Sequence, residues 1–197
     1  MSTIVIVEKN GKAVIAADTM STFGNDIKVT KRYLSNRDKI LKCGETYLGV
    51  VGATSNNNVL RHIFQNYGDD LSFGDEAEIF ETYLKLHTIL KDEYFVNPKE
   101  NDDDPYESSQ IDALIANRSG IYGIYSLREV FKYKRFWALG SGFELAMGAM
   151  FAVYERLSTP EEIAEVAIHA ACEFDNGSAL PFTIYSIEMQ IDEDQRN

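Results

Sequence analysis

The sequence predicts an α+β domain in which sheets are layered against helices. Strand-like segments come first, two helical segments follow, and this order is repeated and closed by a final strand. Segregated runs of strands and helices are typical of α+β folds. The first strand, Ile4 to Val7, is apolar on both faces, which indicates a sheet covered on both sides. No repeat or linker interrupts the chain, so residues 1–197 are expected to form one domain.

The amino-terminal half begins with a predicted β-hairpin. Residues 3–8 and 12–17 are apolar runs joined by Asn10-Gly11, a strong hairpin-turn signal. Two further strands are predicted at 39–43 and 46–51. A short helix is expected at 56–67. A long amphipathic helix is expected at about 75–95, because its apolar residues recur every three or four positions: Ile79, Tyr83, Leu86 and Leu90.

The carboxy-terminal half repeats the pattern. Strands are predicted at 111–117 and 120–125 around Arg118-Ser119, and at 136–139 and 182–189. The segment 143–157 is rich in Ala, Met and Gly, so it is expected to be a buried, closely packed helix. Thr159-Pro160-Glu161-Glu162 combines an N-cap, an N1 proline and an N3 glutamate, which predicts a helix from there to about Phe174.

An acidic loop insertion is predicted at 96–110, where Asn101 to Asp104 gather three aspartates before Pro105. Aspartates in a loop suggest a calcium site, but neither EF-hand spacing nor a turn glycine follows. A solvated loop is therefore the expectation, and no metal site is predicted. The sequence also lacks the glycine patterns of nucleotide sites, so no cofactor is expected.

The charge and the cysteine content restrict the partners and the location. Thirty-one acidic side chains face 19 basic ones, for a formal net charge of −12. Such a surface repels phosphate backbones and anionic lipids, so neither nucleic acid nor a membrane is an expected partner. No run approaches the ~18 apolar residues of a membrane span, and the first residues do not resemble a signal peptide. With only Cys43 and Cys172, a reducing, cytoplasmic location is expected.

Ser2 is the residue with the most distinctive chemistry. Removal of Met1 would leave Ser2 with both its hydroxyl and a free α-amine, directly before a buried strand. Such an amine has a pKa of about 7.7–8.0, so near neutral pH it can accept the hydroxyl proton. One residue would then supply a nucleophile and its base. On its own the pattern carries little weight, because many cytosolic proteins begin with Met-Ser.

Short motifs give this first residue a context. They run in order along nearly the whole chain: Thr3-Ile4-Val5, Asn10-Gly11, Val14 to Asp18, Thr22, Gly24-Asn25, Lys39-Ile40, Leu48 to Ala53, Leu139 to Gly142, and Asp175 with Ser178. In this order they resemble proteasome β-subunits and the bacterial HslV peptidase, and most of all the betaproteobacterial proteasome homologue (BPH). The resemblance implies the N-terminal-nucleophile (Ntn) hydrolase fold, a four-layer αββα sandwich with two antiparallel sheets between helix layers.

The resemblance also implies roles around the nucleophile. Ser2 would attack a peptide carbonyl, and Lys39 would lower the pKa of its amine and hydroxyl. Asp18 would pair with Lys39 and keep it charged. The backbone N–H of Gly49 would donate to the oxyanion, where only a glycine lets the substrate backbone come close.

The remaining implied roles orient the amine and bind substrate. Ser141, Asp175 and Ser178 would hydrogen-bond around the α-amine. Thr22 would bind extended substrate as an added strand, and Tyr47 and Val51, flanking Gly49, would line the first specificity pocket.

Each of these residues also has a purely structural interpretation. Asp18 is a plausible strand-ending turn residue, Lys39 a solvated flank, Gly49 a packing glycine and Ser141 a helix N-cap. Asp175 and Ser178 could serve only as loop polar groups.

The sequence leaves three further points about the site open. The segment from Asp18 to Lys39 is about five residues longer than in typical relatives, so Lys28 or Lys31 is an alternative to Lys39. The pair His169 and Cys172 suggests half of a metal site or a thiol dyad, but no spacing completes a ligand set. Serine in place of the family's threonine removes the methyl group that restricts the rotamer, which is expected to lower activity.

The implied function is peptide-bond hydrolysis by Ser2 inside a self-compartmentalised double ring of six or seven identical subunits, with seven favoured. Substrates would be unfolded polypeptides or peptides. The resemblance allows an ATP-dependent unfoldase as a partner, and no residue identifies one. Two different functions remain open: a catalytically silent or weakly active ring-forming scaffold, and a small-molecule amidase with the same terminal chemistry.

Overall fold

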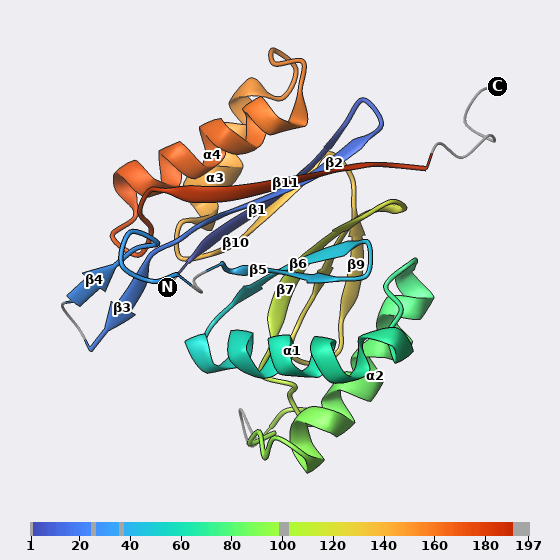
Figure 1. Ribbon diagram of the computed structural model, residues 1–197. Coiled ribbons are helices and arrows are strands. Elements are labelled where there is room, and N and C mark those ends of the chain that lie inside the picture. The colour runs from blue at the N-terminus through green and yellow to red at the C-terminus, as the bar shows by residue number, and fades with distance from the viewer. Residues whose placement is uncertain (1, 25–26, 36–37, 99–102, 191–197) are drawn as a thin grey trace.

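The computed structural model describes residues 2–24, 27–35, 38–98 and 103–190 (Figure 1). Two antiparallel sheets face each other, with one pair of helices on the outer side of each sheet. The result is the four-layer αββα sandwich implied by the sequence. A short two-stranded hairpin projects from one end of the sandwich, close to the first residues.

The first sheet has the strand order β10-β1-β2-β11. Its strands are β1 (Thr3–Lys9), β2 (Lys12–Asp18), β10 (Phe136–Gly140) and β11 (Phe182–Glu188). Helices α3 (Phe143–Val153) and α4 (Pro160–Phe174) cover its outer face (Figure 1). In the register of the sheet, Thr3 lies opposite Gly140, and Asp18 lies opposite Phe182.

The second sheet has the strand order β5-β6-β7-β8-β9. These strands are β5 (Ile40–Cys43), β6 (Thr46–Val51), β7 (Asp112–Asn117), β8 (Gly120–Ile124) and β9 (Val130–Tyr133). Helices α1 (Thr54–Tyr67) and α2 (Glu76–Asp92), with the 3₁₀ turn η1 (Gly68–Asp70) between them, cover its outer face. The projecting hairpin is β3 (Ser21–Phe23) with β4 (Ile27–Val29).

The hydrophobic core lies in three layers between these elements. Alternate residues of β1 serve two of them: Val5 and Val7 pack toward α3 and α4, whereas Ile4 and Ile6 pack between the sheets. Each of the four is fully buried. The doubly apolar first strand therefore does lie in a sheet covered on both sides, and it holds the residue before it in a fixed place.

Two local sequence signals are confirmed in detail. Asn10 and Gly11 have φ angles of 52° and 76°, the positive values that a type I′ hairpin turn requires. At the start of α4, the Thr159 hydroxyl accepts the Glu162 N–H, and the Glu162 carboxylate accepts the Thr159 N–H. This reciprocal capping box begins the helix where the sequence predicted it.

Besides shifts of two or three residues at helix ends and the unpredicted turn η1, the structure differs from the sequence prediction in three places. Strands β3, β4 and β9 were not predicted. Helix α3 ends at Val153 rather than 157, and it buries only one side, because Phe151 is 74% exposed. In the acidic loop 96–110, residues 99–102 lie outside the described part of the chain, and Ser108 and Ser109 are buried rather than solvated.

Among the described residues, no helix combines the length and the apolar character needed to cross a lipid bilayer.

Candidate active site

Ser2 lies at the start of β1 and is only 5% exposed. Its carbonyl oxygen accepts the Ser141 N–H at 2.7 Å and the Ser141 hydroxyl at 3.4 Å. Ser141 follows β10, the strand that pairs with β1. The predicted nucleophile is therefore held by backbone pairing on the inside of the fold rather than lying in solvent.

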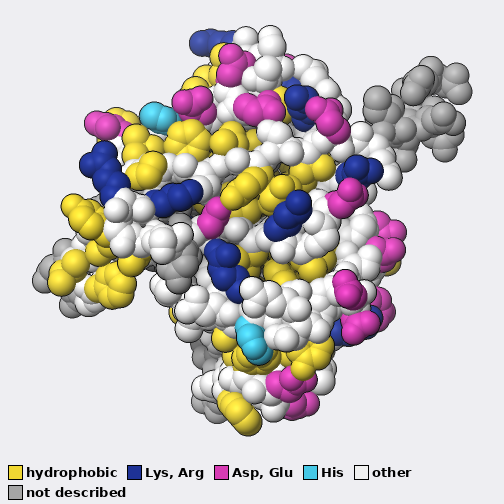
Figure 2. Space-filling model, viewed as in Figure 1, with side chains coloured by type: hydrophobic (Ala, Val, Ile, Leu, Met, Phe, Trp, Pro, Cys, Tyr) yellow, Lys and Arg dark blue, Asp and Glu magenta, His cyan; other side chains and the backbone are white. Residues whose placement is uncertain are grey.

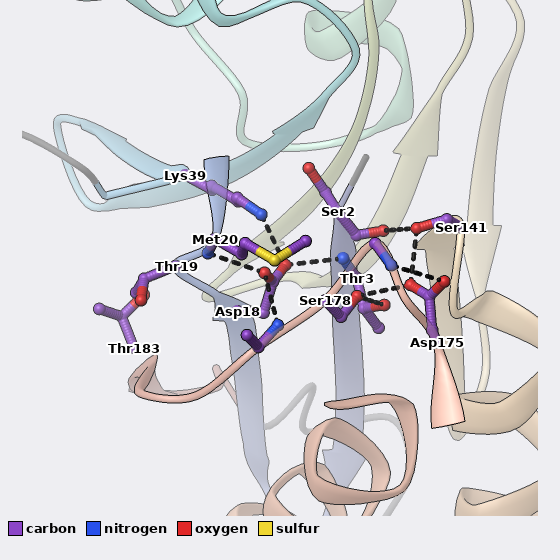
Figure 3. A network of polar contacts seen from close by, with 12 residues as sticks. Ser2, Thr3, Asp18, Thr19, Met20, Lys39, Ser141, Asp175, Ser178 and Thr183 are labelled. Carbon is purple, nitrogen blue, oxygen red and sulfur yellow. Dashed lines mark hydrogen bonds and ion pairs between the residues drawn. The ribbon is translucent and has the colours of Figure 1, made fainter. Parts of the chain in front are cut away.

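Asp18 and Lys39 form a buried ion pair beside this residue (Figure 3). Lys39 Nζ lies 2.6 Å from Asp18 Oδ1, and the two side chains are 2% and 0% exposed. The same oxygen accepts the Thr3 N–H at 2.8 Å. The Lys39 ammonium and the peptide nitrogen that follows Ser2 therefore share one acceptor atom, which places the positive charge next to Ser2.

Backbone groups complete the shell of Asp18. Its Oδ2 accepts the Met20 N–H at 2.9 Å and the Ala179 N–H at 3.4 Å. A buried carboxylate costs free energy unless it is paired and hydrogen-bonded, and here both oxygens are occupied. Lys28, one of the two alternatives to Lys39, donates instead to the Asn176 carbonyl, and the other, Lys31, is exposed.

A second polar network lies on the other side of Ser2. Asp175 Oδ2 accepts hydrogen bonds from Ser141 Oγ and Ser178 Oγ, each at 2.7 Å (Figure 3). Burial alone would raise the pKa of Asp175, but these hydroxyls and the Gly177 N–H outweigh it, so the pKa is lowered. Asp175 is thus kept as an anion that orients both serines.

The structure brings together six of the predicted site residues: Ser2, Asp18, Lys39, Ser141, Asp175 and Ser178. A free amine on Ser2 would lie between a cation on one side and an anion with two hydroxyls on the other. This combination lowers the cost of deprotonating the hydroxyl while offering hydrogen-bond partners to the amine. The arrangement can therefore support nucleophilic attack by the first residue of a trimmed chain.

Gly49 does not lie where the sequence prediction needed it. It is in the middle of β6, opposite Ile40 on one side and Leu114 on the other. The Val50 N–H points to β5, where it donates to the Lys39 carbonyl, so by strand alternation the Gly49 N–H points to β7. This geometry argues against an oxyanion role and favours the packing interpretation.

The space around Gly49 explains why a glycine is there. A Cβ at this position would lie 2.5 Å from Ile4 Cγ2 and 3.1 Å from Ile15 Cδ1. Both contacts belong to the layer between the sheets. Gly49 therefore lets the two sheets approach each other.

The predicted substrate-binding residues are separated in the structure. Tyr47 is half-buried between the sheets and stacks on Tyr185, with ring centroids 4.7 Å apart. Val51, at the end of β6, lines a cavity of about 490 Å³ together with Gly52 and Asn56. Thr22 lies on β3, in the projecting hairpin. A single pocket formed by Tyr47 and Val51 is thus not observed.

Two contributors to the site were missed by the sequence analysis. The Thr3 hydroxyl hydrogen-bonds to Ser178 Oγ at 2.6 Å, and it is fully buried. Gly140 has φ of 101°, and a Cβ there would overlap the Ser2 carbonyl oxygen. The sequence Gly140-Ser141-Gly142 indicates that another backbone segment comes close to it. That this segment is Ser2 follows only from the pairing of β1 with β10.

The alternative site at His169 and Cys172 is not supported by the geometry. Burial, with a smaller contribution from Asp18, raises the pKa of the Cys172 thiol to about 12, so the thiol stays protonated at neutral pH. His169 is half-exposed and lies 3.8 Å from Glu165. Within the described ranges, no group of three or more His, Cys, Asp or Glu side chains could hold a metal ion.

Comparison with solved structures places this architecture among known folds. Eukaryotic HslV from Trypanosoma brucei superposes with a TM-score of 0.70 at 19% identity, over 94% of this chain and 99% of that one. This superposition and the two facing antiparallel sheets between helix layers show that the chain has the proteasome-type fold. Neither a protein-family model nor a curated protein sequence matches the chain.

A second likeness extends to the sequence. BPH of Thiobacillus denitrificans is 34% identical, with a TM-score of 0.89, over 96% of this chain and 100% of that one. The same protein in complex with epoxomicin gives a TM-score of 0.87 at 34% identity and the same coverage. The chain therefore belongs to the proteasome-like BPH family.

Proposed function

We propose that the protein is an N-terminal-nucleophile peptidase that hydrolyses peptide bonds through Ser2, once Met1 has been removed. The observation that carries this proposal is the shared oxygen of Asp18, which accepts both Lys39 Nζ and the Thr3 N–H. It fixes a buried cation beside the first residue of the trimmed chain. The membership in a family with a proteasome-type peptidase fold supports the same reaction.

In this mechanism Ser2 acts as nucleophile and base. Its α-amine takes the hydroxyl proton, directly or through a water, and the oxygen attacks the peptide carbonyl. The proton then passes to the leaving amine, which departs as the acyl ester forms. A water activated by the same α-amine hydrolyses the ester and restores the hydroxyl. Lys39 keeps the amine in its unprotonated, proton-accepting form, and Ser141 and Ser178 orient it with Asp175.

Gly52 replaces Gly49 as the oxyanion donor in this proposal. Gly52 follows β6 with φ of 102°. Apart from its chain neighbours, Asn56 Nδ2 is the one atom of the described residues within 4 Å of the position of its missing Cβ, at 3.9 Å. Gly52 comes two residues after Val50, whose N–H is bound to the carbonyl of Lys39. A backbone that is open to approach and close to the catalytic lysine suits an oxyanion site.

We propose that extended peptide binds along the projecting hairpin. The β3–β4 sheet has two strands, so in the described part of the chain one edge of β3, which carries Thr22, pairs with no other strand. An added substrate strand would use its main-chain groups. Figure 2 shows hydrophobic side chains gathered on this hairpin, where Phe23 is 54% and Ile27 62% exposed. The cavity at Val51 and Gly52 is the proposed specificity pocket.

A double ring of identical subunits, with seven per ring favoured over six, is the proposed assembly. The resemblance to proteasome β-subunits and HslV implies a ring, and a closed chamber would limit substrates to unfolded chains and peptides. An ATP-dependent unfoldase remains a proposed partner of unspecified identity, and the proposed location is the cytoplasm.

The test is covalent capture of Ser2. Protein purified as the assembled particle is incubated with epoxomicin, the ligand in the structure of the relative, and its intact mass is measured. The expected result is a chain that lacks Met1 and carries one adduct, together with hydrolysis of unfolded protein. Ser2→Ala should abolish both while the assembled particle is retained. It is a cleaner variant than Lys39→Ala, which also breaks the buried ion pair.

Each alternative function has its own outcome in this experiment. Chains that keep Met1 and take no adduct would contradict the peptidase and leave a ring-forming scaffold. A monomer or dimer that hydrolyses acyl amides but not unfolded protein would contradict it in favour of a small-molecule amidase.

A further inference from the structure

The carboxylate of Asp38 collects three hydrogen bonds just before the catalytic lysine. Its Oδ1 accepts the Ile40 N–H at 2.9 Å and the Thr183 hydroxyl at 3.0 Å. Its Oδ2 accepts the Tyr185 hydroxyl at 2.6 Å. The carbonyl of the same residue accepts Arg61 Nη2 at 2.6 Å. Asp38 is thus tied to β5, β11 and α1 at once.

These bonds join the two sheets at the position of the active site. Asp38 leads into β5 of the second sheet, whereas Thr183 and Tyr185 lie on β11 of the first. Lys39 is the next residue along the chain, and its ammonium must reach across to Asp18 on β2. On the other side, Thr183 is adjacent to Phe182, the register partner of Asp18. The hydrogen bond between Asp38 and Thr183 is therefore close to both members of the ion pair. Asp38 directly precedes Lys39, and Thr183 directly follows the register partner of Asp18.

We infer that Asp38 is a positioning residue that fixes the distance between Lys39 and Ser2 by clamping the start of β5 to β11. This inference rests on the proposed catalytic role of Lys39. Lys39 has a second backbone anchor, because its carbonyl accepts the Val50 N–H at 3.1 Å. Loss of the clamp should therefore shift the lysine rather than release it.

Tyr185 is well suited to its part in the clamp. Its ring stacks on Tyr47, which fixes the direction of the hydroxyl toward Asp38. The hydrogen bond to Asp38, together with burial, raises the pKa of Tyr185 to about 12. The hydroxyl therefore remains a donor throughout the physiological pH range.

The experiment compares the rate of Ser2 modification by epoxomicin, and kcat and KM for a peptide substrate, in the assembled wild type and in variants. Asp38→Ala should lower kcat and the modification rate by about ten- to a hundredfold, because small misplacements of catalytic groups have effects of this size. KM should change less than about twofold. Asp38→Asn keeps an acceptor for Ile40 and Thr183 and should recover most of the rate. Tyr185→Phe removes one bond and should give an intermediate loss.

The pH profile separates positioning from a general loss of stability. The charged groups of the site are Lys39, Asp18 and Asp175, and only Lys39 should move in the variants. Asp38→Ala and Asp38→Asn both lack the Asp38 charge, so comparing them isolates the position of Lys39. A more distant ammonium lowers the pKa of the Ser2 amine less, so the midpoint of the modification rate should lie at higher pH in Asp38→Ala than in Asp38→Asn. Ser186→Ala, on the same strand but bonded to Glu161, is the control and should leave rate and midpoint unchanged.

The possible outcomes are distinct. The clamp alone would be overturned if the wild type reacts and Asp38→Ala, Asp38→Asn and Tyr185→Phe all keep its rate and midpoint. The proposed function would then stand. A wild type that lacks Met1 yet forms no adduct would overturn the proposed function and the clamp with it. If Asp38→Ala does not assemble, Tyr185→Phe decides: a slower rate with a raised midpoint supports the clamp, and a lower melting temperature without either change contradicts it.

Discussion

Gly140 lies directly against Ser2. Gly140 is the last residue of β10, and Ser2 directly precedes β1, the strand that pairs with β10. A Cβ at position 140 would overlap the carbonyl oxygen of Ser2. The φ of 101° at Gly140 is also one that side-chain-bearing residues rarely adopt. The next residue, Ser141, donates its N–H to that same oxygen. The position of the proposed nucleophile therefore depends on a residue without a side chain.

Gly140→Ala should displace Ser2 and lower its reactivity. The strained φ alone should cost about 1–3 kcal/mol of folding free energy. The overlap with the Ser2 backbone adds to this cost. The rate of Ser2 modification by epoxomicin should fall at least about tenfold in the fraction that remains folded. Gly148→Ala is the matched control for the stability of the single subunit, because Gly148 is a glycine of α3 with open space around it in the single chain, so stability should rise slightly. Equal behaviour of the two variants would contradict the prediction.

Asp175 should make the stability of the protein depend on pH in the acid range. Its pKa lies below the ordinary value of 3.8, so its anionic form contributes stability that is fully present above about pH 4 and is lost as the pH falls through the lower folded-state pKa. Asp175→Asn lacks this contribution. The difference in melting temperature between wild type and variant should therefore be large at pH 6 and shrink toward pH 3.

The control for this measurement is Glu173→Gln, which removes an exposed charge from the last turn of α4, the helix that Asp175 follows as C-cap. Its melting temperature should follow the wild type more closely than that of Asp175→Asn does at pH 6. An Asp175→Asn difference that stays constant or grows toward pH 3 would show that the carboxylate is not stabilised in the folded state.

Local signals in the sequence predicted much of the fold. The Asn10-Gly11 turn and the Thr159–Glu162 capping box act within a few residues, so their structure could be predicted without knowing the rest of the chain. The doubly apolar β1 predicted a covered sheet for the same reason. Strands β3 and β4 are only three residues each, too short to show a period.

The site was less predictable, because it depends on which strands pair. Lys39 could not be separated from Lys28 or Lys31 by spacing, since only the folded chain brings one of them to Asp18. Gly49 and Gly52 are likewise equivalent as sequence features. They differ because the N–H of Gly49 is used in the hydrogen-bond ladder between β6 and β7, whereas Gly52 lies just after the end of β6.

Alanine substitutions at Gly49 and Gly52 should separate packing from catalysis. Gly49→Ala introduces a Cβ 2.5 Å from Ile4 Cγ2, and overpacking of this kind costs about 1–3 kcal/mol. Its modification rate per folded subunit should stay close to that of wild type, because the Gly49 N–H belongs to the ladder with β7 and not to the site. Gly52→Ala has room for the methyl group but strains the backbone at φ 102°, so it should turn the proposed oxyanion N–H and lower kcat by about a hundredfold. Chemical unfolding and peptide hydrolysis measure the two effects, and a reversed pattern would restore Gly49 as the donor.

The exposed side of α3 should be covered when subunits assemble. The sequence predicted a buried helix, and in the single chain Phe151 of α3 and Phe174 at the end of α4 are 74% and 75% exposed. Burying a phenylalanine contributes about 1.5–3 kcal/mol, and a ring repeats the contact in every subunit. Phe151→Ser should therefore shift native mass spectra and light scattering from the proposed double ring toward smaller species at micromolar concentration, with little change in subunit stability. Phe95→Ser, in the residues after α2 on the other side of the sandwich and 85% exposed, is the control. Dissociation by Phe95→Ser but not by Phe151→Ser would place the subunit contact on the opposite helix layer.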